Sequence, residues 1–234
     1  MLILDLDLIS CIAGSAAFTP ASVAGLALYV RSDLGVTQAG GVATAWADQS
    51  GNGNNLASHA AGVQYTSTDS GYGGKPSLGG ISNADYLVGP SMSAILGGGA
   101  TSAELFLVFL PNSSAPFNSQ GWSTDGQNVW YPFSDNNFYD DFGSSIRYNW
   151  APAGIGTQIV YNVAADGTVW TASINGTVSH AVGTNTFASK ATAIDILGTT
   201  ASLHTMAAML IYKNKLSAGD RSSVTGYLRT LYGI

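Results

Sequence analysis

The chain has 234 residues and a net charge of −6, and charged residues make up only 9% of it. This length can bury one full core, and the acidic balance argues against nucleic acid as a partner. The single cysteine, Cys11, excludes an intrachain disulfide and a multi-cysteine metal site. So few charges leave the polar surface mainly to Ser, Thr, Asn and Gly. Because such a surface protects weakly against association, we expect a homo-oligomer within an ordered assembly.

The first ten residues are apolar but lack the pattern of a signal peptide. They contain no basic n-region, and Asp5 and Asp7 interrupt the stretch that should be uninterrupted. Leucine stands at every second position from Leu2 to Leu8, which predicts a half-buried strand. No apolar run reaches the ~20 residues that a membrane helix needs. We therefore expect no membrane insertion and no cleavable export signal.

A tight loop is predicted where the sequence reads WADQSGNGNN, from Trp46 to Asn55. The tryptophan is expected to point inward, while aspartate and serine oxygens accept backbone N–H groups and the glycines take positive φ. The residues expected to shape this loop are Trp46, Asp48, Ser50, Gly51, Asn52, Gly53 and Asn54. Turn chemistry explains each of them, so we interpret the loop as a rigid corner without a ligand.

The segment 159–182 predicts a three-stranded β-meander. Its first turn lies at 165–167 and its second at Asn175-Gly176, the strongest two-residue hairpin signal. Such short strands separated by turn signals are typical of a sandwich or a barrel.

Two further apolar runs predict strands in the core. Residues 104–110 are nearly all apolar and end at Pro111, which predicts a central strand covered on both faces. Residues 205–212 fit a strand or a helix by periodicity alone. The β-formers Ile211 and Tyr212 at its end, followed by a turn, favour the strand.

The last element is predicted to be a helix. Ser217 and Asp220 have the spacing of an N-terminal capping pair, and Gly233 supplies a C-terminal stop. Apolar residues follow at helical spacing, at Val224, Tyr227, Leu228 and Leu231. We expect this stripe to pack against the edge or end of the sandwich.

Several segments together resemble a known family. They are 18–29 (FTPASVAGLALY), 46–55, 75–78 (KPSL) leading to 85–87 (DYL), 173–176 (SING), 209–216 (MLIYKNKL) and 226–233 (GYLRTLYG). In this order they resemble the laminin-G-like, concanavalin A-like lectin/glucanase domains found in phage virion and bacterial surface proteins. The resemblance implies an all-β fold, an antiparallel two-sheet jelly-roll sandwich with a short C-terminal helix, over residues 18–234. Residues 1–17 fall outside it and are expected to be a docking arm.

Lectins, glycosidases and structural modules share this fold, so function must be argued from the residues. Glycoside hydrolysis needs two carboxylates that flank the bond. Catalytic members of the family carry a Glu-x-Asp-x-x-Glu strand, whereas Glu104 is the only glutamate here and has no acidic partner at that spacing. Asp140 and Asp141 are neighbours that point to opposite faces of a strand, and we interpret them as solvated loop carboxylates. The three histidines lie far apart, at His59, His180 and His204, so we predict no catalytic site.

Aromatic residues interleaved with amides and carboxylates lie between positions 122 and 150. Such platforms suit sugar rings, and the candidate glycan ligands are Trp122, Trp130, Tyr131, Asn136, Tyr139 and Tyr148. The alternative is that these rings fill the sandwich core. Oxygen ligands for Ca²⁺ could come from Asp135, Asp140 and Asp141, but they lack the spacing of a calcium loop. The alternative there is an acidic surface turn and no cofactor.

The sequence thus predicts a non-catalytic β-sandwich protein on the surface of a phage virion, as a capsid decoration or fibre component. Its expected partners are sibling subunits, capsid or tail proteins, and cell-surface glycans. The alternative is a free carbohydrate-binding lectin module, and a glycoside hydrolase comes third.

Overall fold

The computed structural model describes residues 17–80, 85–111, 122–124, 129–197 and 205–234. The expected N-terminal strand, nearly all of the docking arm, Cys11 and His204 lie outside the described residues. Of β9, which begins at Trp122, only the backbone is described.

The strands of the first half of the chain are β1 (Leu26–Arg31), β2 (Val36–Ala39), β3 (Val42–Trp46), β4 (Leu56–Ser58), β5 (Val63–Asp69), β6 (Lys75–Gly79), β7 (Leu87–Ser91) and β8 (Ser102–Leu110). Those of the second half are β9 (Trp122–Thr124), β10 (Phe138–Asp140), β11 (Tyr148–Trp150), β12 (Ile159–Asp166), β13 (Trp170–Ile174), β14 (Thr177–Val182), β15 (Ala193–Ile196) and β16 (Thr205–Tyr212). The helices are α1 (Met92–Leu96) and α2 (Ala218–Tyr232), with two 3-10 turns at Pro20–Ser22 and Ser70–Tyr72.

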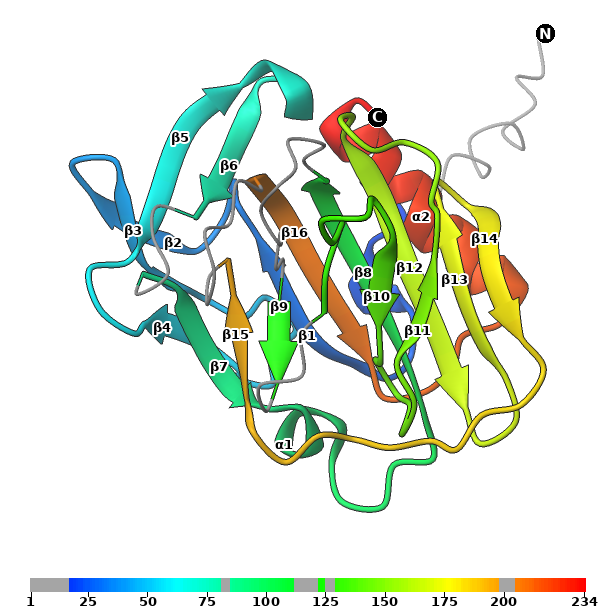
Figure 1. Ribbon diagram of the computed structural model, residues 1–234. Helices are drawn as coiled ribbons and strands as arrows, with labels where there is room; N and C mark the ends of the chain where they lie inside the picture. Colours follow the sequence, from blue (N-terminus) through cyan, green and yellow to red (C-terminus); the bar gives the residue numbers. More distant parts are fainter. Residues whose placement is uncertain (1–16, 81–84, 112–121, 125–128, 198–204) are drawn as a thin grey trace, which may run out of the picture.

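The strands pair antiparallel throughout and form two layers (Figure 1). One layer has the order β14-β13-β12-β8-β16-β1, and the other has the order β6-β5-β3-β4-β7-β15-β9. The expected antiparallel β-sandwich is confirmed, and its two layers are joined into one continuous ladder. The first two residues of β16 pair with β6, and after an irregularity between Met206 and Ala208 the strand pairs with β1. Strands that change layer at such bulges are how sandwiches turn corners.

The main core lies between the layers. Leu105, Leu107 and Phe109 of β8 point into it, and Trp46 and Leu56 reach it from the facing layer. Each fully buried aliphatic or aromatic side chain of this kind contributes about 1.5–3 kcal/mol. A small hairpin, β10–β11, adds aromatic residues to the inner face of β8 and β12 (Figure 1).

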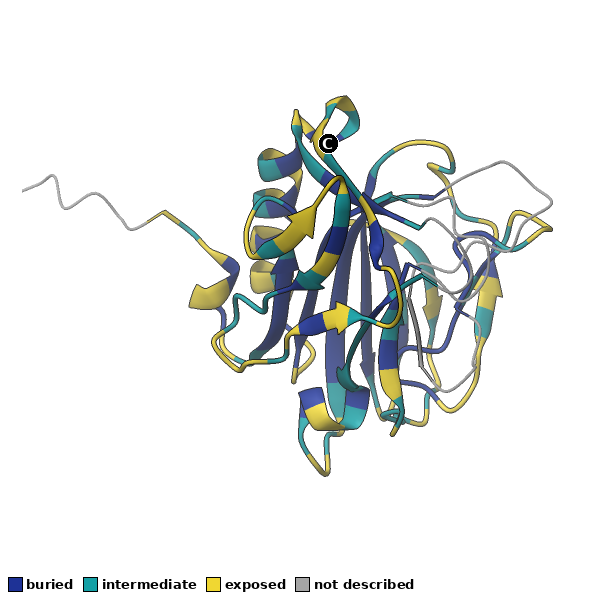
Figure 2. Ribbon diagram, turned by 90° about the vertical axis from the view of Figure 1, so that its left-hand side faces the viewer, coloured by how far each residue is buried: buried dark blue, intermediate teal, exposed yellow. Residues whose placement is uncertain are grey.

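A second core lies on the outer face of the same central strands, beneath α2 (Figure 2). Phe106 and Val108 of β8 contribute to it, together with Leu228 and Tyr232 of the helix. The prediction that β8 is covered on both faces is therefore confirmed. The expectation that the helix packs at an edge or end is wrong, because the alternate side chains of β8 and β16 are apolar and need a cover.

The ends of α2 are as predicted. Ser217 Oγ accepts a hydrogen bond from Asp220 N at 3.1 Å, and Gly233 takes the left-handed conformation with φ of 69°. The meander also has its predicted turn, since Asn175 and Gly176 have φ of 52° and 86°. Both sites follow from local chemistry that tertiary packing does not override.

Candidate functional site

The loop at 46–55 is a corner held against β1. Asp48 accepts hydrogen bonds from the backbone N–H groups of Tyr29 at 2.9 Å, Ser50 at 2.8 Å and Asn54 at 2.9 Å. One carboxylate thus satisfies three backbone donors and ties the loop to the neighbouring strand.

The rest of the corner serves the same purpose. Trp46 is buried and donates from Nε1 to Arg31 O at 2.8 Å. Gly51 and Gly53 have φ of 86° and 75°, which a side chain would disfavour. Asn52 Nδ2 donates to carbonyl oxygens of β1 at 3.0 and 3.3 Å. These polar side chains are bonded to the protein itself, so the corner offers little to a ligand.

Two of the candidate glycan residues have almost no exposed surface. Tyr131 is 0% exposed, packs against Phe138 with ring centroids 5.0 Å apart, and donates its hydroxyl to Asp140. Trp130 is 4% exposed. Stacking needs an open ring face, so we do not retain these two residues as glycan ligands. They fill the core, as the alternative interpretation of this aromatic segment had it.

The other candidates do not form one platform. Asn136 is exposed in the turn before β10, and Tyr139 is half-buried within β10, where it donates its hydroxyl to Asp135 at 2.8 Å. Tyr148 pairs with Asp140 on the opposite strand, so its side chain takes the other face of the hairpin from Tyr139. Trp122 lies in β9, and its side chain is outside the described part of the chain.

The three candidate calcium ligands are not brought together. Asp140 is buried and accepts the hydroxyl of Tyr161 at 2.7 Å, and Asp141 is buried in an ion pair with Lys190 at 3.2 Å. Asp135 is exposed on the hairpin. In the described ranges, no group of three His, Cys, Asp or Glu side chains could hold a metal ion. Interpreting Asp140 and Asp141 as solvated loop residues is also wrong, since aromatic packing encloses that part of the hairpin.

The lone glutamate has a structural role. Glu104 is 0% exposed on the outer face of β8 and accepts two hydrogen bonds from Arg221 of α2, at 2.6 and 2.8 Å. It also accepts from Leu216 N at 2.8 Å and from Asn162 Nδ2 at 3.0 Å. With its oxygens occupied in this way, it is poorly placed to protonate a sugar leaving group.

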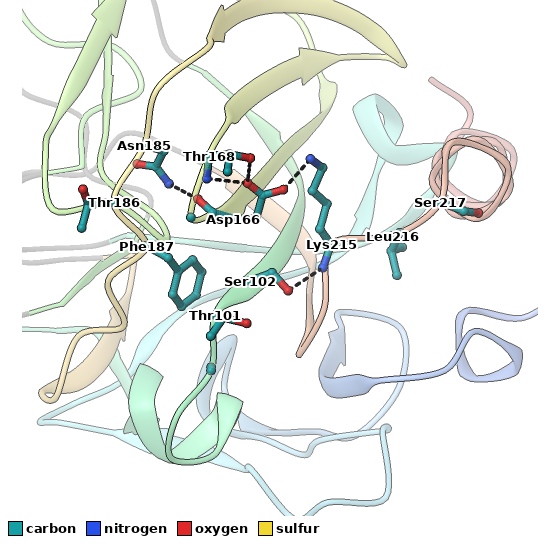
Figure 3. Close-up of a pocket in the computed structure, with 12 residues that line it drawn as sticks. Thr101, Ser102, Asp166, Thr168, Asn185, Thr186, Phe187, Lys215, Leu216 and Ser217 are labelled. Carbon is teal, nitrogen blue, oxygen red and sulfur yellow. Dashed lines mark hydrogen bonds and ion pairs between the residues drawn. The ribbon is translucent and has the colours of Figure 1, made fainter.

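An open groove lies where four loops meet at the end of β8, β12 and β16 (Figure 3). We call it the end groove; it has a volume of about 880 Å³ and is lined by residues 100–102, 166–168, 185–187 and 215–217. The sequence analysis did not find it, because its residues come from distant loops and form no motif. The sequence predicts a turn at 165–167, but gives it no role in binding.

An ion pair crosses one side of the end groove. Lys215 Nζ lies 2.7 Å from Asp166 Oδ2, and Asp166 Oδ1 accepts from Thr168 N at 2.8 Å and from its hydroxyl at 2.7 Å. The hydrogen bond from Lys215, followed by that from Thr168, holds the pKa of Asp166 well below its usual range. The carboxylate is therefore ionised at neutral pH.

The opposite side is set by Asn185. Its amide donates to Asp166 O at 2.6 Å and to Gly143 O at 3.1 Å, and its oxygen lies 3.3 Å from the hydroxyl of Tyr148. The candidate Tyr148 therefore supports this wall. Next along the chain, the half-buried ring of Phe187 is directed toward Thr101 and Ser102 (Figure 3).

The end groove thus combines one aromatic ring with hydroxyls, an amide-fixed loop and an ion pair. A hydroxyl-bearing ring ligand could stack on Phe187 while its edge bonds to Thr168 and Lys215. Among the described residues, Asp166 is the one carboxylate that lines this groove, and it is already paired. The arrangement suits binding better than bond cleavage, which normally requires two carboxylates.

Comparison with solved structures shows the fold. The chain is similar to the receptor-binding domain of botulinum neurotoxin C/D mosaic serotype, with a TM-score of 0.63 and 10% identity over 87% of this chain and 51% of that one. It is similar to the binding domain of Paraclostridial Mosquitocidal Protein 1, with a TM-score of 0.63 and 9% identity over 92% of this chain and 56% of that one. It is also similar to Trypanosoma rangeli sialidase, with a TM-score of 0.61 and 11% identity over 89% of this chain and 34% of that one.

The chain spans about half the length of the two toxin domains and a third of the sialidase. At this low identity the similarity establishes the β-sandwich fold, and the activity has to be argued from the residues of the site. No protein-family model and no curated protein matches the chain. Among the described residues, no helix is both long and apolar enough to cross a membrane.

Proposed function

We propose that this protein is a non-catalytic adhesion and structural module of a phage virion, a capsid decoration or fibre component, that contacts cell-surface glycans through the end groove. The observation that carries the glycan proposal is the groove itself, where the ring of Phe187 lies beside hydroxyl-bearing walls and the Asp166–Lys215 pair. Aromatic faces with polar edges are the surface that sugars require.

The neighbours in fold support a binding role. One of them, the binding domain of botulinum neurotoxin DC, is described in complex with SialylT, and the type C toxin with two ganglioside molecules. The sialidase argues the other way, as an enzyme with a similar sandwich. We favour binding because Glu104 is enclosed by Arg221, and Asp166, the one acid that the described residues contribute to the end groove, is held by Lys215.

The virion proposal rests on the sequence. The surface has few charges, and an apolar arm at residues 1–17 precedes the sandwich domain at 18–234, as in a subunit that adds a strand to a sibling or a capsid protein. The alternative is a free lectin module, which would use the same groove without an assembly.

Replacing Phe187 with alanine should weaken binding to the best saccharide from a glycan array about tenfold, since a stacked ring is worth about 1.4 kcal/mol. Titration calorimetry measures this directly. Tyr139→Ala, on the hairpin, is the matched control and should change the affinity less than about twofold. If Tyr139→Ala weakens binding and Phe187→Ala does not, the glycan site lies at Asn136 and Tyr139 instead. If no glycan binds saturably to the native protein, the glycan part of the proposal fails.

Deleting residues 1–17 should leave the sandwich folded and reduce the protein to a monomer, because the arm supplies the assembly contact. Light scattering and circular dichroism of both forms measure these two properties. A full-length protein that is already a strict monomer favours the free lectin. A truncated protein that still assembles shows that the arm does not dock.

A further inference from the structure

A second groove lies between α2 and the outer face of the β12–β13–β14 meander (Figure 1). We call it the helix groove; it has a volume of about 490 Å³. It adjoins the end groove at Lys215, which lines both. Within the described ranges, Lys215 is the one lining residue that the two grooves share.

The sheet face beneath the helix changes character along this groove. Over β8 and β16 the outward side chains are apolar, as at Phe106 and Leu210, and they pack under α2. Over β12 and β13 they are Asn162, Thr171 and Ser173, which line the helix groove. A helix needs an apolar face to pack on, so this polar extension adds little to its docking.

The groove concentrates positive charge in an acidic protein. Three of the eight basic residues line it, Lys215, Arg221 and Arg229, and the described part of the chain contributes no carboxylate to the lining. Lys215 and Arg221 are neutralised by Asp166 and Glu104, which lie just outside the lining. Arg229 has an exposed side chain, whose Nε donates to the main-chain oxygen of Ile234, the last residue of the sequence, at 3.2 Å.

Two buried polar atoms in the lining have no hydrogen-bond partner among the residues that the structure describes. Asn162 Oδ1 comes from the sheet and Thr225 Oγ1 from the helix, and these residues are 2% and 5% exposed. The amide nitrogen of Asn162 is fixed by Glu104 Oε1 and Leu105 O, both at 3.0 Å. The oxygen of Asn162 therefore requires a donor from outside the protein, and leaving such an atom unpaired is costly.

We propose that the helix groove is a second saccharide site, which takes an acidic sugar. The exposed guanidinium of Arg229 would form an ion pair with the carboxylate of the sugar. The hydroxyls of the sugar would donate to Asn162 Oδ1 and form a hydrogen bond with Thr225 Oγ1. This inference rests on the proposed function in that the ligand is a saccharide. It adds that one glycan, bound across Lys215, contacts the protein at two places: by stacking in the end groove and by an ion pair in the helix groove.

The test uses two probes that differ in one group, a disaccharide that contains glucuronic acid and its neutral glucose counterpart, with inorganic sulfate as a third. In NMR titrations of the full chain, the acidic disaccharide should shift the amide signals of Thr171, Ser173 and Gly226. Its affinity should exceed that of the neutral sugar about tenfold and fall as salt is added. Arg229→Gln should remove this preference, and Thr225→Val, which keeps the shape of the side chain, should weaken binding.

Arg147→Gln is the matched control, since it removes the same charge from the β10–β11 region and should leave the affinity unchanged. Phe187→Ala should also leave the helix groove signals intact, so that failure of the end groove and failure of this site are told apart. Equal affinity for the acidic and neutral sugars overturns the proposal. Sulfate that binds as tightly as the acidic disaccharide also overturns it. The absence of shifts in the amide signals of the helix groove does so too, and would indicate that water occupies the groove.

Discussion

Replacing Arg221 with methionine should lower the free energy of unfolding by about 3–5 kcal/mol, because it leaves the carboxylate of Glu104 buried without its cation. The side chain of Glu104 is 0% exposed, whereas that of Arg221 is 25% exposed and covers it from α2. The other partners of Glu104, Leu216 N and the amide of Asn162, are neutral and cannot replace the charge. Urea unfolding followed by circular dichroism measures the loss.

Two variants separate the ion pair from packing. Arg229→Met changes the other arginine of α2, which is exposed and bonds a main-chain oxygen, and should cost less than about 1 kcal/mol. Glu104→Gln together with Arg221→Met removes both charges and should cost less than Arg221→Met alone. Equal losses for the Arg221 and Arg229 variants would show that the buried pair is not what holds the helix to β8.

The native protein should lose about 2 kcal/mol of stability between pH 4 and pH 7 through Asp140 alone. Burial raises the pKa of Asp140 to about 6, against the lowering effect of hydrogen bonds from Tyr131, Phe142 N and Tyr161. The unfolded chain has the ordinary pKa near 3.8. The folded state thus binds the extra proton between these values, so the stabilisation is complete below pH 4 and is lost as the pH rises through 6.

Asp140→Asn keeps an acceptor for Phe142 N at the same position and cannot titrate, so its stability should change less over this range. The quantity to measure is the difference between the two proteins at pH 4, 5, 6 and 7. This difference removes the contribution of His180, whose pKa burial lowers and whose effect has the opposite sign. Asp135→Asn, on the same hairpin, is the control and should leave the slope unchanged. Parallel curves for the native protein and Asp140→Asn would refute the assignment.

The fold could be predicted where local chemistry decides it. Asn175-Gly176 permits few turns, Ser217 and Gly233 mark the ends of one helix, and the unbroken apolar run from Leu105 to Leu110 requires cover on both faces. The position of that cover could not be predicted. The apolar stripe of α2 indicates that the helix packs on an apolar surface, but it does not indicate that this surface is the outer side of β8 and β16.

The sites were harder to predict for a different reason. The end groove brings Ser102, Asp166, Phe187 and Lys215 together from four separate loops, and no spacing in the sequence connects them. The aromatic segment gave the opposite difficulty. Its composition suits sugar binding and core packing equally, and only the pairing of β10 with β11 over β12 places Tyr131 inside and Tyr139 near the surface.

The place of β16 in the ladder also governs the order in which the chain can fold. β1 and β8, which are made early, flank this strand, yet β16 comprises residues 205–212. A nascent chain on the ribosome therefore carries the apolar run of β8 throughout the synthesis of β9 to β15 before the middle of the sheet can close. Pairing between strands so distant in sequence slows folding and exposes aggregation-prone intermediates. We therefore expect chaperones that shield nascent chains to assist the folding of this protein.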